Sequence, residues 1–346
     1  MPTLNIAKRK TQTILKWGGI SLIIIFLFLS FGRFATFIKE SLTPAPAPNA
    51  LFGKLPPVTF PNQQKENIIY SLDTLTGFLP NFSDRAKVYK ITPDQPTLLG
   101  LPKTREKVAH AGFKSQETQI AEDVYQFSDQ DSGLQRRITI NIFSSDFTLS
   151  SLYLLSPSLQ TLASFDQQEN AIDEAKSFLT QMSLFPEDVD AKKTKTALFS
   201  IEKGAIAPTS KISNAKIVRV DFFQKDVDGL PIYYEKGVTS TIDLLIGKEN
   251  NQLKVVGATY FHKNISKNPS TYAIKSASQA FSELRQGMGF VASKAVDVVE
   301  VTIKKVYLGY YVGETEQEFL MPIVIFEGDN DFVAYVSSVR DEWINN

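Results

Sequence analysis

The sequence predicts an α+β protein, in which an N-terminal transmembrane helix precedes tandem modules of antiparallel sheet with a helix on one face. Three observations predict this fold class. A charge-free apolar run, Trp17–Gly32, lies near the start of the chain. Two amphipathic helix patterns follow after residue 165, and short segments of alternating polarity, bounded by turn residues, surround them. Helices and antiparallel strands in this order pack as a helix layer on one face of a sheet.

The apolar run predicts a membrane anchor. A spanning helix needs about 20 mostly apolar residues, and apolar residues resume after Arg33, so the predicted helix covers residues 13–38. Arg33 can reach the lipid headgroups along its own side chain. The anchoring side chains are Trp17, Ile20, Leu22, Ile24, Phe26, Phe28 and Arg33.

The charges around this helix predict its orientation. Four basic residues and no acidic residue precede the apolar run that starts at Trp17, which places the N-terminal tail, residues 1–12, in the cytoplasm. We therefore expect a single-pass protein of the plasma membrane, with the bulk of the chain extracytoplasmic. The alternative interpretation is a cleaved signal peptide with a small-residue site at Ala45-Pro46-Ala47. Both interpretations export the same domain.

Composition argues against several classes of function. Residues 1–40 carry six basic residues and one acidic residue, a net charge of +5, and the rest of the chain carries −5. A mildly acidic ectodomain argues against nucleic acid as a partner, because nucleic-acid binding needs basic patches. The chain contains no cysteine, so it has no disulfide, no thiol nucleophile and no zinc site of the cysteine type. An exported domain without disulfides fits a bacterial cell envelope.

Changes of pattern along the chain predict six regions. They are a cytoplasmic tail (1–12), the transmembrane helix (13–38), a Pro-rich stalk (41–61), a mostly-β extracytoplasmic region (62–165) and two helix-plus-sheet modules (166–265 and 266–346). Prolines in the stalk favour an extended polyproline II conformation. From Leu51 onward the stalk contains Leu, Phe and Val, so packing of its second half on the globular part is left open.

The mostly-β region is expected to contain one helix and one hairpin. The helix is predicted at Lys103–Ala111. The hairpin is predicted to join Ile120–Phe127 and Leu134–Leu149 around the turn Asp129–Gly133. Within its second strand, isoleucines at 138, 140 and 142 alternate with polar residues, which is typical of a half-buried antiparallel strand.

Each later module is predicted to start with an amphipathic helix. The first, Gln167–Leu184, places apolar residues at 3.6-residue spacing and ends before Pro186. The second begins at Ser276, which can form a capping box with Gln279, and it closes at Gly287.

Strands follow each of these helices. The turn residues Asp228-Gly229 and Lys248–Asn251 predict two hairpins. A slip of the apolar phase at Lys304-Lys305 predicts a β-bulge. The expected strands are Ile217–Gln224, Leu230–Lys236, Ser240–Ile246, Leu253–Phe261, Val298–Tyr311, Phe319–Glu327 and Phe332–Val339.

Two stretches of the modules match each other. LPIYYEKG at Leu230–Gly237 resembles MPIVIFEG at Met321–Gly328, and an aromatic pair precedes each of them. The match predicts a duplicated helix-plus-sheet unit. The alternative is that two aromatic hairpins look alike without a common origin. The segment around Lys103–Leu149 is a candidate for a degenerate third copy.

From Gln167 to Val339, the order of elements resembles PepSY-type exported domains. The resemblance rests on an Ala-rich helix, a strand, the sequence DGLPI, and strands of the kind TIDLLIG and LKVVGATYF. The chain is also similar to the YycH/YycI group of membrane-anchored regulators of a sensor kinase. The resemblance implies extracytoplasmic modules of PepSY- or cystatin-like type and a non-enzymatic role in inhibiting, scaffolding or sensing. No binding residue of these families maps onto this sequence.

No catalytic motif is found in the sequence, so we predict no catalytic, cofactor-binding or metal-binding residue and do not expect an enzyme. His110 and His262 are expected to be surface or partly packed side chains. The acidic segments at Asp129 and Asp329 are interpreted as turns, with a weak calcium site at the second as the alternative. The alternative function is a membrane-tethered envelope hydrolase with paired carboxylates, for which Glu235 and Glu327 are the first suspects.

Aromatic pairs supply the candidate protein-binding residues. Neighbouring residues on a strand point to opposite faces, so one member of each pair is expected in the core and the other on a face suited to binding a protein or peptide. The alternative is that a helix or the sister module covers them. The pairs are Phe222 and Phe223, Tyr233 and Tyr234, and Tyr310 and Tyr311. We therefore expect a regulator or scaffold in a bacterial cell envelope, whose partners are the membrane and a membrane or envelope protein.

Overall fold

The computed structural model describes residues 47–63, 67–92, 96–157, 159, 165–237 and 239–345. The chain divides into two compact units, Met1–Pro48 and Asn49–Asn346. The predicted membrane anchor, residues 13–38, lies outside the described residues and stays a prediction. Within the described ranges, no helix combines the length and the apolar character needed to cross a bilayer.

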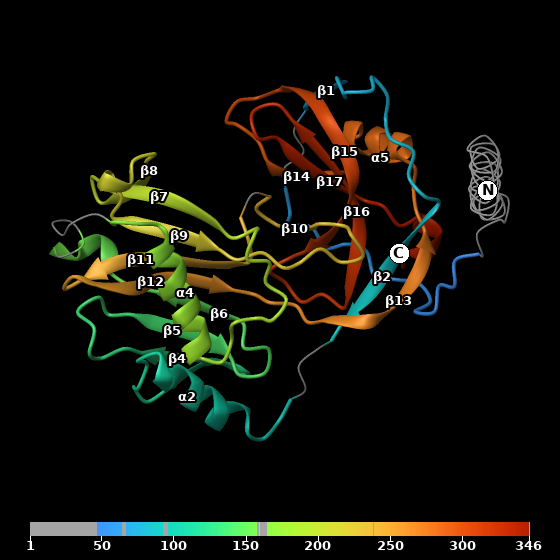
Figure 1. Cartoon of the computed structure of the whole chain (residues 1–346). Helices are drawn as coiled ribbons and strands as arrows, with labels where there is room; N and C mark the ends of the chain where they lie inside the picture. The colour runs from blue at the N-terminus through green and yellow to red at the C-terminus, as the bar shows by residue number, and fades with distance from the viewer. Residues whose placement is uncertain are drawn as a thin grey trace, which may run out of the picture. The chain divides into compact units, whose positions relative to one another are not determined.

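Residues 49–346 have a mixed α+β fold that consists mostly of sheet (Figure 1). The larger sheet has nine strands, and its neighbouring strands run antiparallel. In spatial order they are β3 (Thr118–Ala121), β4 (Val124–Ser128), β5 (Arg137–Asn141), β6 (Phe147–Ser150), β12 (Gln252–Tyr260), β11 (Ile242–Glu249), β9 (Ile217–Asp221), β7 (Lys195–Glu202) and β8 (Ala205–Pro208).

The second sheet has eight strands and a main path of five. The path runs β1 (Ile69–Leu72), β15 (Glu300–Val312), β16 (Phe319–Gly328), β17 (Val333–Ser337) and β14 (Phe290–Ser293). Off this path, β10 (Ile232–Tyr234) pairs with β15, β2 (Arg85–Ile91) with β16, and β13 (Ile265–Ala273) with β2. Strands β1 and β10 run parallel to β15, whereas the other pairs are antiparallel.

Helices lie against both sheets. They are α2 (Gly100–His110), α4 (Glu169–Gln181) and α5 (Ala277–Arg285), and short 3-10 turns occur at Tyr153–Leu155, Ile212–Asn214 and Asp341–Trp343. Helix α4 crosses one face of the nine-stranded sheet over β9, β11 and β12, and α5 packs on β17 (Figure 1). The apolar stripe of α4 is buried there, from Ala171 to Met182. Each sheet therefore carries a helix on one face, as the hydrophobic periodicity predicts.

The ends of both predicted helices follow local signals. At the start of α5, the Ser276 side chain accepts a hydrogen bond from Gln279 N, and the Gln279 side chain accepts one from Ser276 N, so the capping box is confirmed. Gly287 follows α5 with a φ of 71°, the left-handed conformation that favours glycine. Helix α4 ends at Gln181, earlier than predicted, because Ser183 already adopts a left-handed φ of 56°.

The order of a helix followed by a four-stranded meander occurs twice in the part of the chain that forms the nine-stranded sheet. Helix α2 is followed by the meander β3–β6, and α4 is followed by the meander β7, β9, β11 and β12, with β8 added at its edge. The two meanders meet at their last strands, where Thr148 of β6 is opposite Thr259 of β12. The rings of Phe147 and Tyr260 stack beside this pair at 5.1 Å. The segment around Lys103–Leu149 therefore shares the topology of the segment that follows it.

The hairpin predicted in the mostly-β region is a four-stranded meander. A turn after Ala121 and a second turn after Asn141 divide each of the two predicted strands. The second turn forms because Asn141 Oδ1 accepts hydrogen bonds from the backbone N–H groups of residues 143 and 144. The turn at Asp129 is confirmed, and the Asp129 carboxylate forms a buried ion pair with Arg136.

The hairpin predicted at Asp228-Gly229 forms its turn but not its strands. Both residues have positive φ, and Val227 and Leu230 form the closing bridge. Strand β9, however, belongs to the nine-stranded sheet, whereas β10 pairs in parallel with β15. Burial of Tyr234 in a cluster with Tyr310 and other residues of the second sheet takes the place of the local pairing. The matching stretches LPIYYEKG and MPIVIFEG therefore have different positions in the second sheet.

Two other sequence signals are confirmed. The register of β15 against β16 shifts between Ile303 and Lys305, which is the predicted bulge. The turn between β11 and β12 uses Asn250 and Asn251 with φ of 49° and 63°.

The second half of the Pro-rich segment packs on the globular unit. Leu55 is fully buried, and its N–H donates to Trp343 O at 2.8 Å. The Phe60 ring lies 4.8 Å from the Tyr311 ring and 5.3 Å from the Phe290 ring. The segment from Asn49 onward is thus part of the compact unit rather than a free stalk.

Candidate functional site

A pocket of about 780 Å³ opens where the chain leaves β12 and enters β13. We call it the His262 pocket. Its walls come from the loop after α4, the turn after β9, and the segment between β12 and β13. They include Leu184, Glu187, Asp188, Lys225, Tyr260 and His262.

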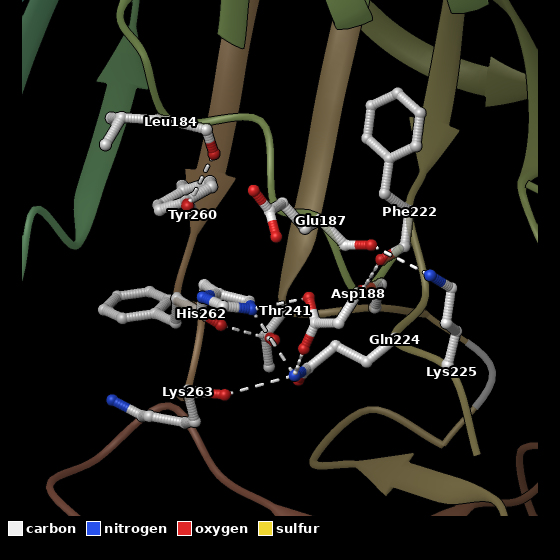
Figure 2. A network of polar contacts seen from close by, with 12 residues as sticks. Leu184, Glu187, Asp188, Phe222, Gln224, Lys225, Thr241, Tyr260, His262 and Lys263 are labelled. Carbon is white, nitrogen blue, oxygen red and sulfur yellow. Dashed lines mark hydrogen bonds and ion pairs between the residues drawn. The ribbon is translucent and has the colours of Figure 1, made fainter. Parts of the chain in front are cut away.

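The His262 ring is held by the carboxylate of Asp188. His262 Nε2 lies 2.9 Å from Asp188 Oδ1, and the side chain of His262 is only 12% exposed. Gln224 Nε2 donates to Asp188 Oδ2 at 2.7 Å and to the carbonyl oxygen of Lys263 at 3.1 Å. Figure 2 shows the carboxylate of Asp188 between His262 and the Gln224 amide. Both carboxylate oxygens are engaged, so the ring has a defined orientation.

Main-chain contacts fix the loop that carries Asp188. The carbonyl oxygen of Asp188 accepts a hydrogen bond from Lys225 N at 2.7 Å, and the next residue, Val189, forms an isolated antiparallel bridge with Gln224. Tyr260 donates from its hydroxyl to the carbonyl oxygen of Leu184 at 2.7 Å (Figure 2). The loop after α4 is therefore bound to the ends of both β9 and β12.

His262 is positioned by an extension of the β11–β12 pairing. Just before β11, Thr241 donates from its hydroxyl to Phe261 O at 2.7 Å, and Phe261 N donates to Thr241 O at 2.8 Å. One bond comes from a side chain and the other from the backbone, and together they tie Phe261, the residue before His262, to the residue before β11.

The electrostatics of the network favour an ionised Asp188. Burial raises the pKa of Asp188, but the hydrogen bond and charge of His262 and the hydrogen bond from Gln224 lower it further, so the net pKa lies below the usual value. Gln224 is 2% exposed, and its Oε1 is buried with no hydrogen-bond partner in the structure. The amide therefore acts as a donor that holds Asp188.

A second pocket of about 450 Å³ shares Ser144, His262 and Asn264 with the first. Most of its charged lining residues are acidic: Asp123, Asp146, Glu314, Glu316 and Glu318. Lys263 Nζ lies 3.4 Å from Asp146 Oδ2, and burial raises the pKa of Asp146. Residues 262 and 263 therefore stand between a pocket of mixed charge and an acidic one.

A histidine oriented by a carboxylate is an arrangement that general bases use. Of the serines that line the His262 pocket, Ser144 accepts a hydrogen bond from Asp146 N, and Ser145 accepts one from Lys107 Nζ. Among the described residues, no three or more His, Asp or Glu side chains are arranged to hold a metal ion. The site thus offers charged and hydrogen-bonding groups to a ligand, around a ring of defined orientation.

The six aromatic residues proposed from sequence are mostly core. Phe222, Tyr234, Tyr310 and Tyr311 are at most 2% exposed, whereas Phe223 and Tyr233 are half-buried. Both members of the last pair are buried because β15 faces apolar clusters on each side. Tyr234 contributes to the site indirectly, since its hydroxyl accepts a hydrogen bond from Gln224 N at 3.1 Å. The protein-binding role of these residues stays a prediction.

The carboxylates of Glu235 and Glu327 have separate sets of partners. Glu235 accepts a hydrogen bond from Glu314 N at 3.2 Å. Glu327 accepts hydrogen bonds from Tyr233, at 2.9 Å, and from Tyr307. Burial raises the pKa of Glu327, but these hydrogen bonds outweigh it and the net pKa lies below the usual value. The hydrolase alternative stays a hypothesis.

Comparisons with known proteins identify no family. A scan against protein-family models and a search of curated proteins find no match. Among solved structures, an uncharacterized protein from Eubacterium rectale ATCC 33656 has 12% identity and a TM-score of 0.37, over 77% of this chain and 86% of that one. The Bacillus megaterium YpeB C-terminal domain has 11% identity and a TM-score of 0.32, over 72% of this chain and 100% of that one. Both are weak structural neighbours.

Proposed function

We propose that this chain is a single-pass, membrane-anchored extracytoplasmic protein that acts as a non-enzymatic regulator or scaffold in a bacterial cell envelope. In this proposal it binds a polypeptide segment of a membrane or envelope protein in the His262 pocket. The observation that carries the proposal is the pocket itself, about 780 Å³ in volume, with an oriented His262 in its wall. Ligand sites in proteins commonly have volumes of roughly 300 to 1,000 Å³.

The lining of the pocket supports a polypeptide as the ligand. It combines apolar side chains, such as Leu184 and Ile265, with both signs of charge. The positively charged residues are Lys107, Lys225 and Lys267, and the negatively charged residues are Glu187, Asp188 and Asp226. A polypeptide presents apolar, cationic, anionic and amide groups together, so it can complement such a lining.

The fold supports the same class of protein. Each sheet carries a helix on one face, and the order of helix and meander occurs twice in the nine-stranded sheet. Tandem helix-on-sheet modules of this kind agree with the resemblance to PepSY-type exported domains. The sequence around the predicted anchor supplies the membrane part of the proposal.

Site-specific photocrosslinking in native membranes tests the binding site. A photoreactive amino acid is placed at position 187, which is exposed and lines the pocket, and one at exposed position 106 on α2 is the matched control. We expect one defined membrane or envelope protein to crosslink at position 187 and not at position 106. Asp188→Asn, which weakens the hold on His262, should reduce the crosslink several-fold, whereas His110→Gln should leave it unchanged.

Two outcomes would contradict the proposal. Equal crosslinking at positions 187 and 106 would show that the pocket does not select the partner. Retention of cell-wall fragments by a chain without residues 1–40, with no protein crosslink, would favour an envelope enzyme or a wall-binding module.

A further inference from the structure

Strand β14 is an edge of the second sheet, and a side-chain amide occupies its outer side. Among the described strands, β14 pairs only with β17. On the opposite side, Val291 N donates to Gln63 Oε1 at 2.9 Å, and Gln63 Nε2 donates to Val291 O at 2.5 Å. A carboxamide offers the same donor and acceptor as a peptide group. Gln63 therefore takes the place that a residue of a neighbouring strand would have.

A pocket of about 490 Å³ lies beside this edge. Its lining includes Gln63, Ile68, Tyr70, Leu284 and Val291. Ile68, Tyr70, Leu284 and Val291 belong to, or pack against, the apolar cluster between α5 and the sheet. These four side chains give the pocket an apolar part, and the pocket reaches the sheet edge at Val291.

The pairing geometry predicts which group of an added strand would enter this pocket. A residue that exchanges both backbone hydrogen bonds with Val291 is its directly paired neighbour. Side chains of directly paired residues lie on the same face of the sheet. The Val291 side chain lines the pocket, so the side chain of the paired residue would point into the same pocket.

Displacement of Gln63 requires only a local change. The residue is exposed, and its two hydrogen bonds are those of a single flexible side chain. Phe60, three residues before it, is held separately by its ring contacts with Phe290 and Tyr311. The side chain can therefore swing away while the packed part of the segment stays in place.

We propose that the outer edge of β14 binds an extended polypeptide segment of a partner protein, which displaces Gln63 and inserts one apolar side chain into the adjacent pocket. This is β-strand addition, in which main-chain hydrogen bonds supply affinity and the pocket supplies specificity. The site is separate from the His262 pocket and does not depend on the function proposed for that pocket.

Peptide binding to the full-length chain tests the proposal. The probe is a fluorescein-labelled pentapeptide with a central leucine between threonines, and the readout is fluorescence anisotropy. Gln63→Ala frees both backbone groups of Val291, so we expect it to bind the probe about tenfold more tightly than the wild type. Gln119→Ala is the matched control, because Gln119 is an exposed glutamine on the edge strand β3 of the other sheet. It should bind as the wild type does.

Two further arms separate strand addition from other binding. A probe N-methylated at the central leucine cannot donate to Val291 O, and it should not bind the Gln63→Ala protein. Adding Val291→Pro to Gln63→Ala removes the outward N–H, a change that edge strands tolerate, and it should also abolish binding. If circular dichroism shows that this double variant is unfolded, the N-methylated probe makes the same test on folded protein.

The results of this peptide-binding test can be told apart from those of the crosslinking test at the His262 pocket. Asp188→Asn should leave probe binding unchanged, whatever it does to the membrane crosslink. Three results would overturn the proposal: no probe binding by any variant, equal affinities of Gln63→Ala and Gln119→Ala, or full binding of the N-methylated probe.

Discussion

Two aspartates face each other on neighbouring strands of the nine-stranded sheet. Asp221 at the end of β9 pairs with Asp243 of β11. Asp221 is 2% exposed, and its Oδ2 lies 3.0 Å from Arg219 Nε. Burial and the charge of Asp221 raise the pKa of Asp243 to about 6, against the opposing effects of Arg219 and Lys236. The ionised form of Asp243 is therefore unfavourable in the folded protein.

We predict that Asp243→Asn stabilises the protein at neutral pH but not at pH 4. The ordinary pKa of the group is 3.8, so between about pH 4 and pH 6 the folded chain keeps a proton that the unfolded chain releases. The free energy of unfolding of the wild type therefore falls as the pH rises through this window. Asparagine does not titrate, so the variant should be more stable than the wild type by about 1 to 3 kcal/mol at pH 7. Denaturant unfolding across this pH range measures the difference, and a difference that is constant with pH would contradict the prediction.

At the scale of elements, the sequence predicts those features whose signals are local. The capping box of α5, the turn at Asn250-Asn251 and the bulge before Lys305 depend on neighbouring residues, and all three are confirmed. The partner of β10 could not be predicted in this way. Its turn has a strong local signal at Asp228-Gly229, but the strand pairs with β15, some 80 residues further along the chain. Burial of Tyr234 against distant side chains decides that pairing.

The capping box gives a prediction for α5. Ser276→Ala removes the acceptor for Gln279 N, so an N–H at the start of α5 loses its partner. We expect a loss of about 1 kcal/mol in the free energy of unfolding. Ser278→Ala is the matched control, because Ser278 is exposed on the first turn of the same helix. It should change stability by less than about 0.5 kcal/mol. Equal effects of the two substitutions, measured by denaturant unfolding, would show that the cap does not stabilise α5.

At the scale of the whole molecule, the candidate site brings together segments that no sequence spacing relates. Asp188 lies in the loop after α4, Gln224 follows β9, and His262 follows β12. They meet because β9, β11 and β12 are consecutive in the sheet. Of the three, only His262 was singled out in the sequence, and it was expected to be a surface or partly packed side chain rather than part of a site. Asp188 and Gln224 could not be identified beforehand, since nothing in their local sequence indicates a shared partner.

The Pro-rich segment gives a last prediction, because composition suggests a stalk and the structure shows packing. Leu55 is fully buried beside the C-terminal residues, whereas Leu51 is 72% exposed. We therefore expect Leu55→Ala to lower the free energy of unfolding by about 2 to 5 kcal/mol, and Leu51→Ala to change it by less than about 0.5 kcal/mol.

Tryptophan fluorescence can follow unfolding in the apolar cluster that contains Leu55. The chain has two tryptophans, Trp17 and Trp343, and the Trp343 ring lies 5.9 Å from the Tyr272 ring in the same apolar cluster as Leu55. A Trp17→Phe background leaves Trp343 as the sole reporter. If Leu55→Ala and Leu51→Ala then unfold at the same denaturant concentration, residues 49–61 act as a stalk. A midpoint lowered only by Leu55→Ala would place the start of the folded unit near Asn49, because a segment that contributes to stability belongs to the core it covers.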